Sequence, residues 1–400
     1  MSEMSYLEKL LDGVEVEWRN LGDTSLFEIA NNGRKPVKAS LRIAGETPYY
    51  GANNIQDYVD GYTHDGEYVL IAEDGSASLE NYSIQYATGK FWANNHVHVV
   101  RGKERVHSRF LYHYLCIVNF LPFLTGGGRA KLTKGQLIEI PVPIPCPDNP
   151  EKSLAIQSEI VRILDKFSAL TALLTAELNM RKKQYNYYRD QLFSFGAHDV
   201  KRLKLGELCV IGDGLHGTPE YDANGDYFFI NGNNLGYQKI SFNDNTKKVN
   251  DSMFKKHGIH FDPINTVFLS INGTIGNVSF YNNEKIVLGK SVAYFKIKSP
   301  ELHTRYLFYF LQTNYAKQYF ENQKTGSTIK NLGLKSLRAF EIPIPSYDEQ
   351  LYIVATMDKF YNLTNSITEG LPREIELRQK QYEYYRDLLF SFPKPETVSN

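Results

Sequence analysis

The sequence predicts an α+β protein in which two mixed, strand-rich domains are separated by two long antiparallel helices, with an internal pseudo-twofold repeat. The first observation behind this prediction is a segment that occurs twice. Residues 181–195 read RKKQYNYYRDQLFSF, and residues 378–392 read RQKQYEYYRDLLFSF. Twelve of the fifteen positions are identical at a constant offset of 197. Such self-similarity indicates that the chain arose by duplication.

The repeat continues upstream of these two segments. Residues 157–167, QSEIVRILDKF, align with residues 350–360, QLYIVATMDKF, at an offset of 193. A proline-rich stretch precedes each copy, IPVPIP at 140–145 and IPIP at 342–345. The change of offset from 193 to 197 means that the second copy carries four additional residues. Four residues are close to one helical turn.

The second observation is helical periodicity within each repeat. Between residues 152 and 192, apolar residues such as Ile156, Ile160 and Ile163 recur at spacings of three and four. A helix over 154–189 would be roughly 54 Å long, more than one small domain covers. Pairing with the second repeat would bury this apolar stripe. An internal pseudo-twofold makes the pair antiparallel, and Gly370-Leu-Pro372 predicts a kink in the second helix.

The third observation is the composition between the helices. Residues 18–145 and 202–345 are rich in Gly, Asn, Tyr and β-branched residues with turn pairs such as Asn272-Gly273, which favours strands. The sequence therefore predicts a first strand-rich domain at 1–150, a central helix at 151–195, a second domain at 196–347, a C-terminal helix at 348–392 and a tail at 393–400.

Composition restricts the class of protein. The 45 Lys and Arg balance the 45 Asp and Glu, so nucleic-acid binding would depend on a local basic surface. The three scattered cysteines indicate reduced thiols in a cytoplasmic protein, with neither a disulfide framework nor a zinc site. The longest apolar run, 111–124, has 14 residues, fewer than the about 20 that a membrane span needs. We therefore expect no membrane partner.

Several further segments are specific enough to suggest a family. They are the Thr-Ala-Glu-Leu unit at 175–178, the repeated tails Tyr-Tyr-Arg-Asp-x-Leu-Phe-Ser-Phe, and LEKLLDGVEVEW at 7–18. With these segments the chain resembles the specificity subunit of type I restriction–modification systems, type IC group. PYYGANNI at 48–55, with DGEYVLIAEDG at 65–75 and NNHVH at 94–98, is similar to target-recognition domains of that family. The resemblance covers nearly the whole chain.

This resemblance implies a DNA-binding subunit without catalytic residues, cofactor or metal of its own. Each target-recognition domain would read one half of a split double-stranded DNA sequence. The helices would set the gap between the halves and dock two modification (methyltransferase) subunits, which carry S-adenosylmethionine and methylate adenine. Up to two ATP- and Mg-dependent restriction subunits would join. If half-sites of roughly 3–4 bp lie on one face of B-DNA, about 10 bp apart, the gap is about 6 bp.

Glycine-rich basic turns are the first class of DNA-binding candidates. They occupy matching places in the two domains, GGGRAKLTK at 126–134 and KTGSTIKN at 324–331. Glycines expose backbone N–H groups, and Lys and Arg neutralise phosphates. An ordinary basic surface loop is the alternative interpretation. The candidates are Arg129, Lys131, Lys134, Lys324, Thr328 and Lys330.

Paired asparagines and nearby rings form the second class. An asparagine side chain can read an adenine edge in the major groove, although asparagine is also common in turns. An aromatic or histidine ring can pack on DNA or beneath a loop, and packing is the better interpretation for each ring individually. The candidates are Asn53, Asn54, Asn233, Asn234, Tyr50 and His216, together with Tyr49 and Tyr237. His96 and His98, which alternate on a predicted strand, are interpreted as structural because no ligand set accompanies them.

Repeated basic and aromatic residues on the helices are candidates for partner docking. A solvated helix face is the alternative for the basic residues. The tyrosines are too numerous for one buried helix side, and surplus aromatics often mark interfaces. We expect them to pack at the helix ends against the two domains, with part left for the modification subunits. The docking candidates are Arg181, Lys182, Tyr185, Tyr188, Arg378, Lys380, Tyr382 and Tyr385.

Two other functions remain as alternatives. A stand-alone DNA methyltransferase or nuclease would bind S-adenosylmethionine itself. The chain, however, has no Walker loop and no Asp/Asn-Pro-Pro-Tyr tetrapeptide. A purely protein-binding helical scaffold would show no salt-dependent affinity for DNA. Each alternative therefore has its own discriminating measurement.

Overall fold

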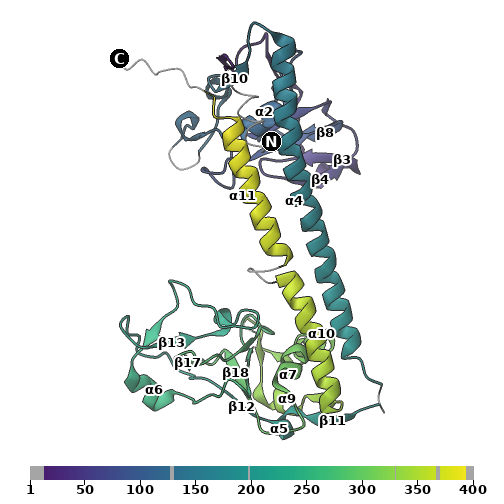
Figure 1. The fold of residues 1–400 in the computed structure, drawn as a ribbon. Coiled ribbons are helices and arrows are strands. Elements are labelled where there is room, and N and C mark those ends of the chain that lie inside the picture. Colours follow the sequence, from purple (N-terminus) through teal and green to yellow (C-terminus); the bar gives the residue numbers. More distant parts are fainter. Residues whose placement is uncertain (1–12, 127–129, 197–198, 329, 366–369, 393–400) are drawn as a thin grey trace. The chain divides into compact units, whose positions relative to one another are not determined.

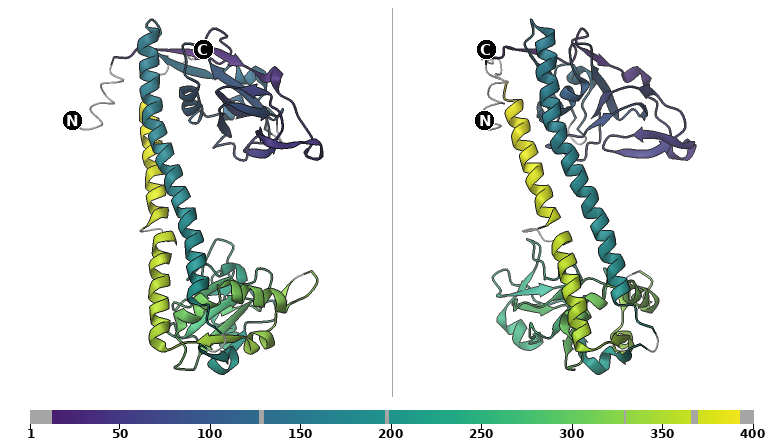
Figure 2. Two further views of the ribbon diagram at one scale, coloured as in Figure 1. Left: turned by 90° about the vertical axis from the view of Figure 1, so that its right-hand side faces the viewer. Right: turned by 45° about the vertical axis from the view of Figure 1, so that its right-hand side comes forward.

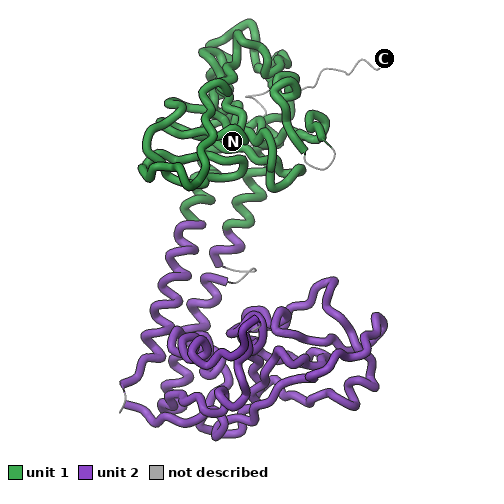
Figure 3. Tube along the Cα trace, turned by 180° about the vertical axis from the view of Figure 1, so that it is seen from behind, with its two compact units in different colours: residues 1–174, 375–400 green, residues 175–374 purple. Residues whose placement is uncertain are grey.

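The fold was analysed in a computed structural model, which describes residues 13–126, 130–196, 199–328, 330–365 and 370–392. The chain divides into two compact units (Figure 3). Unit 1 comprises residues 1–174 and 375–400, and unit 2 comprises residues 175–374. Each unit thus contains one strand-rich domain, one part of a long helix and one C-terminal helix.

Unit 1 contains three sheets. A two-stranded antiparallel sheet pairs β1 (Val16–Asn20) with β10 (Pro141–Pro145). A four-stranded antiparallel sheet has the order β2 (Phe27–Ile29), β9 (Val97–Gly102), β6 (Tyr68–Ala72), β7 (Ile84–Ala87). A third sheet has the order β4 (Ile55–Val59), β3 (Ala44–Tyr50), β8 (Lys90–Ala93), β5 (His64–Asp65), with β3 and β8 parallel. Helix α2 (Ser108–Leu115) packs on β6, β7 and β9, and the one-turn helix α3 (Lys134–Leu137) precedes β10.

Unit 2 repeats this strand order. β11 (Lys201–Lys204) pairs with β21 (Glu341–Ile344), and the four-stranded sheet runs β12 (Cys209–Asp213), β18 (Val292–Ile297), β15 (Thr266–Ser270), β16 (Val278–Phe280). The third sheet runs β14 (Lys248–Val249), β13 (Tyr227–Ile230), β17 (Ile286–Leu288); its parallel pair β13–β17 corresponds to β3–β8, and no strand beside β17 in the described residues corresponds to β5. The remaining elements are β19 (Lys324–Thr325), β20 (Asn331–Leu332), α5 (Leu205–Leu208), α6 (Asp251–His257), α7 (Thr304–Phe310), α8 (Asn314–Gln323) and α9 (Leu334–Ala339). The equal order confirms the duplicated α+β fold.

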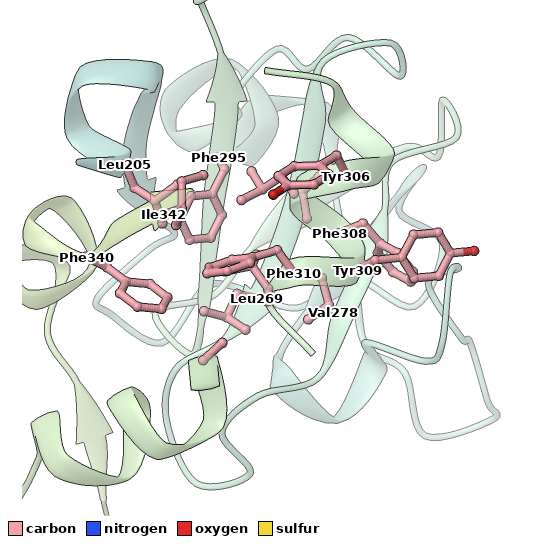
Figure 4. Close-up of a cluster of buried hydrophobic side chains, with 14 of the residues drawn as sticks. Leu205, Leu269, Val278, Phe295, Tyr306, Phe308, Tyr309, Phe310, Phe340 and Ile342 are labelled. Carbon is pink, nitrogen blue, oxygen red and sulfur yellow. The ribbon is translucent and has the colours of Figure 1, made fainter. Parts of the chain in front are cut away.

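The core of unit 2 lies between α7 and the four-stranded sheet. Figure 4 shows Tyr306 and Phe310 of α7 directed toward Phe295 of β18 and Leu269 of β15. All four side chains are at most 1% exposed. Burying an aromatic or leucine side chain contributes about 1.5–3 kcal/mol, so this layer is a main source of stability in the unit.

The long helix α4 runs without a break from Pro150 to Leu192, 43 residues. Pro150 occupies the first helical position, and the side chain of Asn149 accepts a hydrogen bond from Lys152 N at 3.0 Å, which caps the helix start. Figures 1 and 2 show α4 antiparallel to α11 (Leu371–Leu389) within unit 1 and to α10 (Tyr347–Asn365) within unit 2.

The C-terminal repeat forms two helices where we expected one kinked helix over 348–392. Gly370, with φ of 85°, precedes α11, and Pro372 lies in the first turn of that helix. Glycine tolerates positive φ, and proline is tolerated in a first turn because its N–H would have no helical partner there. Residues 366–369 and the tail at 393–400 lie outside the described residues.

Stacked aromatic pairs join the helices within each unit. Phe167 of α4 stacks on Tyr385 of α11, with ring centroids 5.2 Å apart. Tyr188 of α4 stacks on Phe360 of α10 at 5.4 Å. The two pairs are equivalent under the sequence repeat. The identity of these two positions between the repeats is therefore explained by the pairing of the helices.

A buried histidine of α2 also contacts both helices of unit 1. His113 is fully buried, with Nε2 2.8 Å from Asp165 Oδ1 and Nδ1 3.2 Å from the Tyr382 hydroxyl. Burial lowers the pKa of His113 to about 4, although the carboxylate of Asp165 acts in the opposite direction. The imidazole is therefore neutral at pH 7.

This pKa predicts an acid-sensitive stability of unit 1. An unfolded histidine has a pKa of about 6.5, so below that pH the unfolded state binds a proton that the folded state does not. The contribution of neutral His113 to the free energy of unfolding is fully present above about pH 6.5. It decreases as the pH falls toward 4, by about 2 kcal/mol between pH 7 and pH 5. Urea unfolding at both pH values measures the loss. His113→Gln is expected to remove this pH dependence. If the variant loses as much stability between pH 7 and pH 5 as the wild type, His113 is not its source.

Candidate nucleic-acid interface

Three loops of unit 1 meet at one edge of the four-stranded sheet. Asn53, which follows β3, donates its amide to Gly75 O and accepts from Ala77 N, both at 2.8 Å. Lys131 forms antiparallel backbone bridges with both Asp74 and Thr125. The loops after β3 and β6 and the glycine-rich turn therefore form one surface.

Charged side chains are concentrated at this edge. Glu73, 16% exposed, accepts from Arg34 at 2.5 Å and from Lys131 at 2.9 Å. Burial by itself raises the pKa of Glu73, but the hydrogen bonds from Arg34 and Lys131 outweigh it, and the pKa lies below its usual value. The carboxylate thus holds Lys131 in place, while the lysine side chain remains 45% exposed.

The two histidines of β9 and its preceding loop have structural partners. His98 is fully buried, with Nε2 2.7 Å from Leu132 O and Nδ1 2.9 Å from the Asn31 amide. His96 lies 2.6 Å from Asp74. No group of three potential metal ligands occurs among the described residues.

In the described part of the chain no helix is both long and apolar enough to cross a membrane.

Unit 2 builds the same edge from different residues. Asn272 and Asn331 form the backbone bridge that corresponds to Asp74 and Lys131. Gly126 and Gly326 have nearly equal φ angles, 93° and 94°, and each opens the glycine-rich turn of its unit. The matching turns therefore occupy the same position in the two units, with a charged pair at the backbone bridge in one and an amide pair in the other.

Comparison with known proteins identifies the family. The family model for the type I restriction modification DNA specificity domain matches residues 14–180 and 198–377. The chain belongs to this family. It is 45% identical to a putative type I restriction enzyme specificity subunit of Haemophilus influenzae, over 97% of this chain and 98% of that protein. It is 38% identical to the EcoR124I/EcoR124II specificity subunit of Escherichia coli over 100% of both chains.

Solved structures show the same fold. The S subunit from M. genitalium aligns over 96% of this chain and 98% of its own, with a TM-score of 0.54 at 14% identity. A chain from a structure on complex assembly and conformational transition of the type I R-M system covers 94% of this chain and 97% of its own, with a TM-score of 0.59. The expected DNA specificity subunit is thereby confirmed, and the strand-rich domains are hereafter called recognition domains 1 and 2.

The structure places Asn234 inside a turn. This side chain is 9% exposed; it accepts from Asn231 N at 3.0 Å and donates to Ser241 O at 3.1 Å. Both groups of its amide have partners within the turn, which favours the turn interpretation of Asn234 over base reading. Asn233 beside it is exposed, as is Asn54 in recognition domain 1. Asn53 is exposed as well, but its amide braces the neighbouring loop.

The candidate rings lie mostly within the protein. Tyr49 is 1% exposed, and the half-buried Tyr50 packs edge-on against Phe91 at 5.8 Å. Tyr237 stacks on Tyr361 of α10 at 4.7 Å. These contacts favour packing beneath a loop over stacking on DNA. His216 is different: its side chain is 72% exposed, with Nε2 2.8 Å from Asp213.

The basic candidates are on the surface where the structure describes them. Lys134, Thr328 and Lys330 are exposed, and the Lys330 ammonium donates to Gly326 O at 2.9 Å. Lys324 pairs with Glu321 and is half-buried. Arg129 lies outside the described residues.

The docking candidates divide by burial. Tyr185 is 7% exposed, and its hydroxyl hydrogen-bonds to that of Tyr237, so this ring packs against recognition domain 2, as expected at a helix end. Tyr382 and Tyr385 are half-buried, whereas Tyr188 is 45% exposed. Of the basic candidates, Arg181 and Arg378 are half-buried and bond to residues of their own helices, and Lys182 and Lys380 are exposed.

Two further tyrosines of the repeat belong to the surplus aromatics that were expected to leave part of their surface for the modification subunits. Tyr187 and Tyr384 are 61% and 56% exposed and occupy equivalent positions of the repeat. No core packing explains the identity of two such exposed side chains. Identity between the repeats could have singled them out only in combination with the side of the helix that faces solvent.

Salt dependence measures the role of the glycine-rich turn. Lys131→Gln is expected to weaken DNA binding by the assembled complex to a similar degree for all sequences. It should also reduce the slope of log affinity against log salt by about 0.9, the value for one phosphate contact. Lys103→Gln is the control, since Lys103 follows the opposite end of β9. An unchanged slope for the Lys131 variant would exclude a phosphate contact there.

Proposed function

We propose that recognition domain 1 reads one half of a split DNA target and recognition domain 2 the other, with a gap of about 6 bp set by the paired helices. The carrying observation is that two units of equal strand order present different side chains at the same loop edge: Asp74 and Lys131 against Asn272 and Asn331. Equal scaffolds with different surface groups suit two similar binding events of different specificity, because base edges are distinguished by donors and acceptors.

We further propose that the helices dock two modification subunits, and that up to two restriction subunits join the complex in the cytoplasm. The repeat supports two equal docking surfaces, since exposed positions such as Lys183 and Lys380, or Tyr187 and Tyr384, are identical. In this proposal S-adenosylmethionine, ATP and Mg bind to the partner subunits. A rigid link between two weak half-site readers raises the affinity for the complete target through effective concentration.

The decisive experiment is to co-express the chain with a modification subunit of the same type and to map methylated adenines by single-molecule sequencing. A split motif with a fixed gap is the expected result. A continuous motif would show that the helices are not a spacer. As a companion measurement, S-adenosylmethionine binding by the isolated chain would instead favour a stand-alone methyltransferase.

A further inference from the structure

In each unit an aspartate of α4 or α10 holds a helix of the recognition domain, α2 or α7. In unit 1, Asp165 Oδ1 of α4 accepts from Arg109 Nε and from His113 Nε2, both at 2.8 Å. In unit 2, Asp358 Oδ1 of α10 accepts from Arg305 Nη2 and from the Tyr309 hydroxyl. In both units the two donors are four residues apart on one face of α2 or α7. The contact is therefore duplicated although one of its donors has changed from histidine to tyrosine.

A buried glutamine two turns earlier makes a second attachment. Gln157 Oε1 accepts from His107 N at 2.9 Å, and its amide donates to Arg105 O at 3.1 Å. Gln350 accepts from His303 N at 2.9 Å and donates to Glu301 O at 2.7 Å. Both glutamines are fully buried. Each aspartate lies eight residues after its glutamine, about 12 Å along the helix. Two attachments at this separation prevent the domain from pivoting about either one.

The ion pairs of the two aspartates contribute little to folding. Asp165 and Asp358 are 39% and 34% exposed, and their arginine partners are 28% and 36% exposed. Ion pairs at such sites typically contribute below about 1 kcal/mol, because water and salt screen them. Folding stability alone therefore gives no strong reason for the same attachment in both units, whereas a fixed angle between domain and helix does.

We propose that Asp165 and Asp358 are positioning residues for the gap in the DNA target. Each sets the angle at which its recognition domain leaves the spacer helices, and so where its half-site must lie. Without the aspartate, the glutamine attachment becomes a pivot and targets with a shorter or longer gap are accepted. This inference rests on the proposed function, because it presupposes that each domain reads a half-site.

The test uses the complex with the modification subunit and duplexes that carry both half-sites at the preferred gap, one base pair less and one base pair more. Asp165→Ala and Asp358→Ala are each expected to reduce the ratio of methylation at the preferred gap to methylation at the other gaps by about tenfold. The reason is that a less rigid link loses part of the avidity that a matched rigid link provides. Methylation at the preferred gap should change little. The double variant should discriminate less than either single variant.

Matched variants separate positioning from simple loss of structure. Asp165→Asn retains an acceptor oxygen and is expected to restore most of the discrimination. Tyr309→Phe removes only the hydroxyl that donates to Asp358, so it should act in the same direction with a smaller effect. Glu177→Ala removes an α4 carboxylate that pairs with Arg181 on the same helix, and it should leave the gap profile unchanged.

Two results would overturn the inference. One is a wild-type gap profile in both alanine variants. The other is an equal loss of methylation at every gap together with a lower melting temperature, which would make the aspartates folding residues only. Absence of a split target in the wild-type complex is a separate result that would overturn the proposed function itself.

Discussion

Replacing residues 18–145 by residues 202–345 of the same chain is expected to convert an asymmetric DNA target into a palindrome. The two segments share their strand order, and each attaches to its helices through equivalent glutamine and aspartate residues. Because the sequence repeat predicts an internal pseudo-twofold, we expect two copies of one reader to face the DNA in opposite orientations. The complex should lose its preference for the half-site that the first domain reads. The ratio of its affinity for that half-site to its affinity for unrelated sequence should fall by at least about 10³-fold.

Mapping methylated adenines in the complex measures this change directly. The reciprocal replacement, residues 18–145 in place of 202–345, should yield the palindrome of the other half-site at the same gap. Survival of the original asymmetric motif would show that bases are read outside the recognition domains. A palindrome with an altered gap would instead place part of the gap determinant inside the exchanged segments.

Phe390→Ala is expected to destabilise unit 1 by about 3–5 kcal/mol, the usual cost of removing a buried aromatic ring. Phe390 is 6% exposed and packs on Phe110 and Tyr114 of α2, with ring centroids 5.3 Å and 5.7 Å away. The C-terminal repeat therefore closes the core of the N-terminal domain. Loss of this ring leaves a cavity where two segments distant in sequence meet.

The same change in unit 2 provides a matched comparison. Phe193 occupies the equivalent position and packs on Tyr306 at 4.9 Å and Phe310 at 5.9 Å. Urea unfolding followed by limited proteolysis should show unit 1 opening first in Phe390→Ala and unit 2 opening first in Phe193→Ala. Tyr384→Ala, which alters an exposed ring, should change the stability by less than about 0.5 kcal/mol. Simultaneous opening of both units in every variant would show that they unfold as one cooperative structure.

The expected binding residues illustrate how far local patterns extend. Paired asparagines appear after a strand in both halves of the sequence, yet Asn233 is exposed while Asn234 is buried and bonded inside its own turn. Base reading and turn formation use the same amide group. No single-sequence pattern separates them, because the difference depends on which partners the fold brings within hydrogen-bond distance.

The repeated tyrosines show the same limit on the helices. Tyr185 and Tyr187 are both identical in the second repeat, but Tyr185 is buried and Tyr187 is 61% exposed. A residue can be identical in both repeats because it packs in the core or because it lies at an interface, so identity does not distinguish the two. Helical periodicity indicates one buried side, yet here a ring from a distant loop, Tyr237, covers a second side of α4.

The sequence by itself determined the duplication, the α+β class, the continuous helix α4 and the family, because repeat identity and helical periodicity are local properties of the chain. Tertiary structure alone decided which asparagines and tyrosines stay accessible. It also decided that Asp165 and Asp358 bind the equivalent helices α2 and α7, through pairs separated by more than 50 residues. The physical reason is that burial and hydrogen bonding depend on neighbours in space, and long-range packing assigns those neighbours.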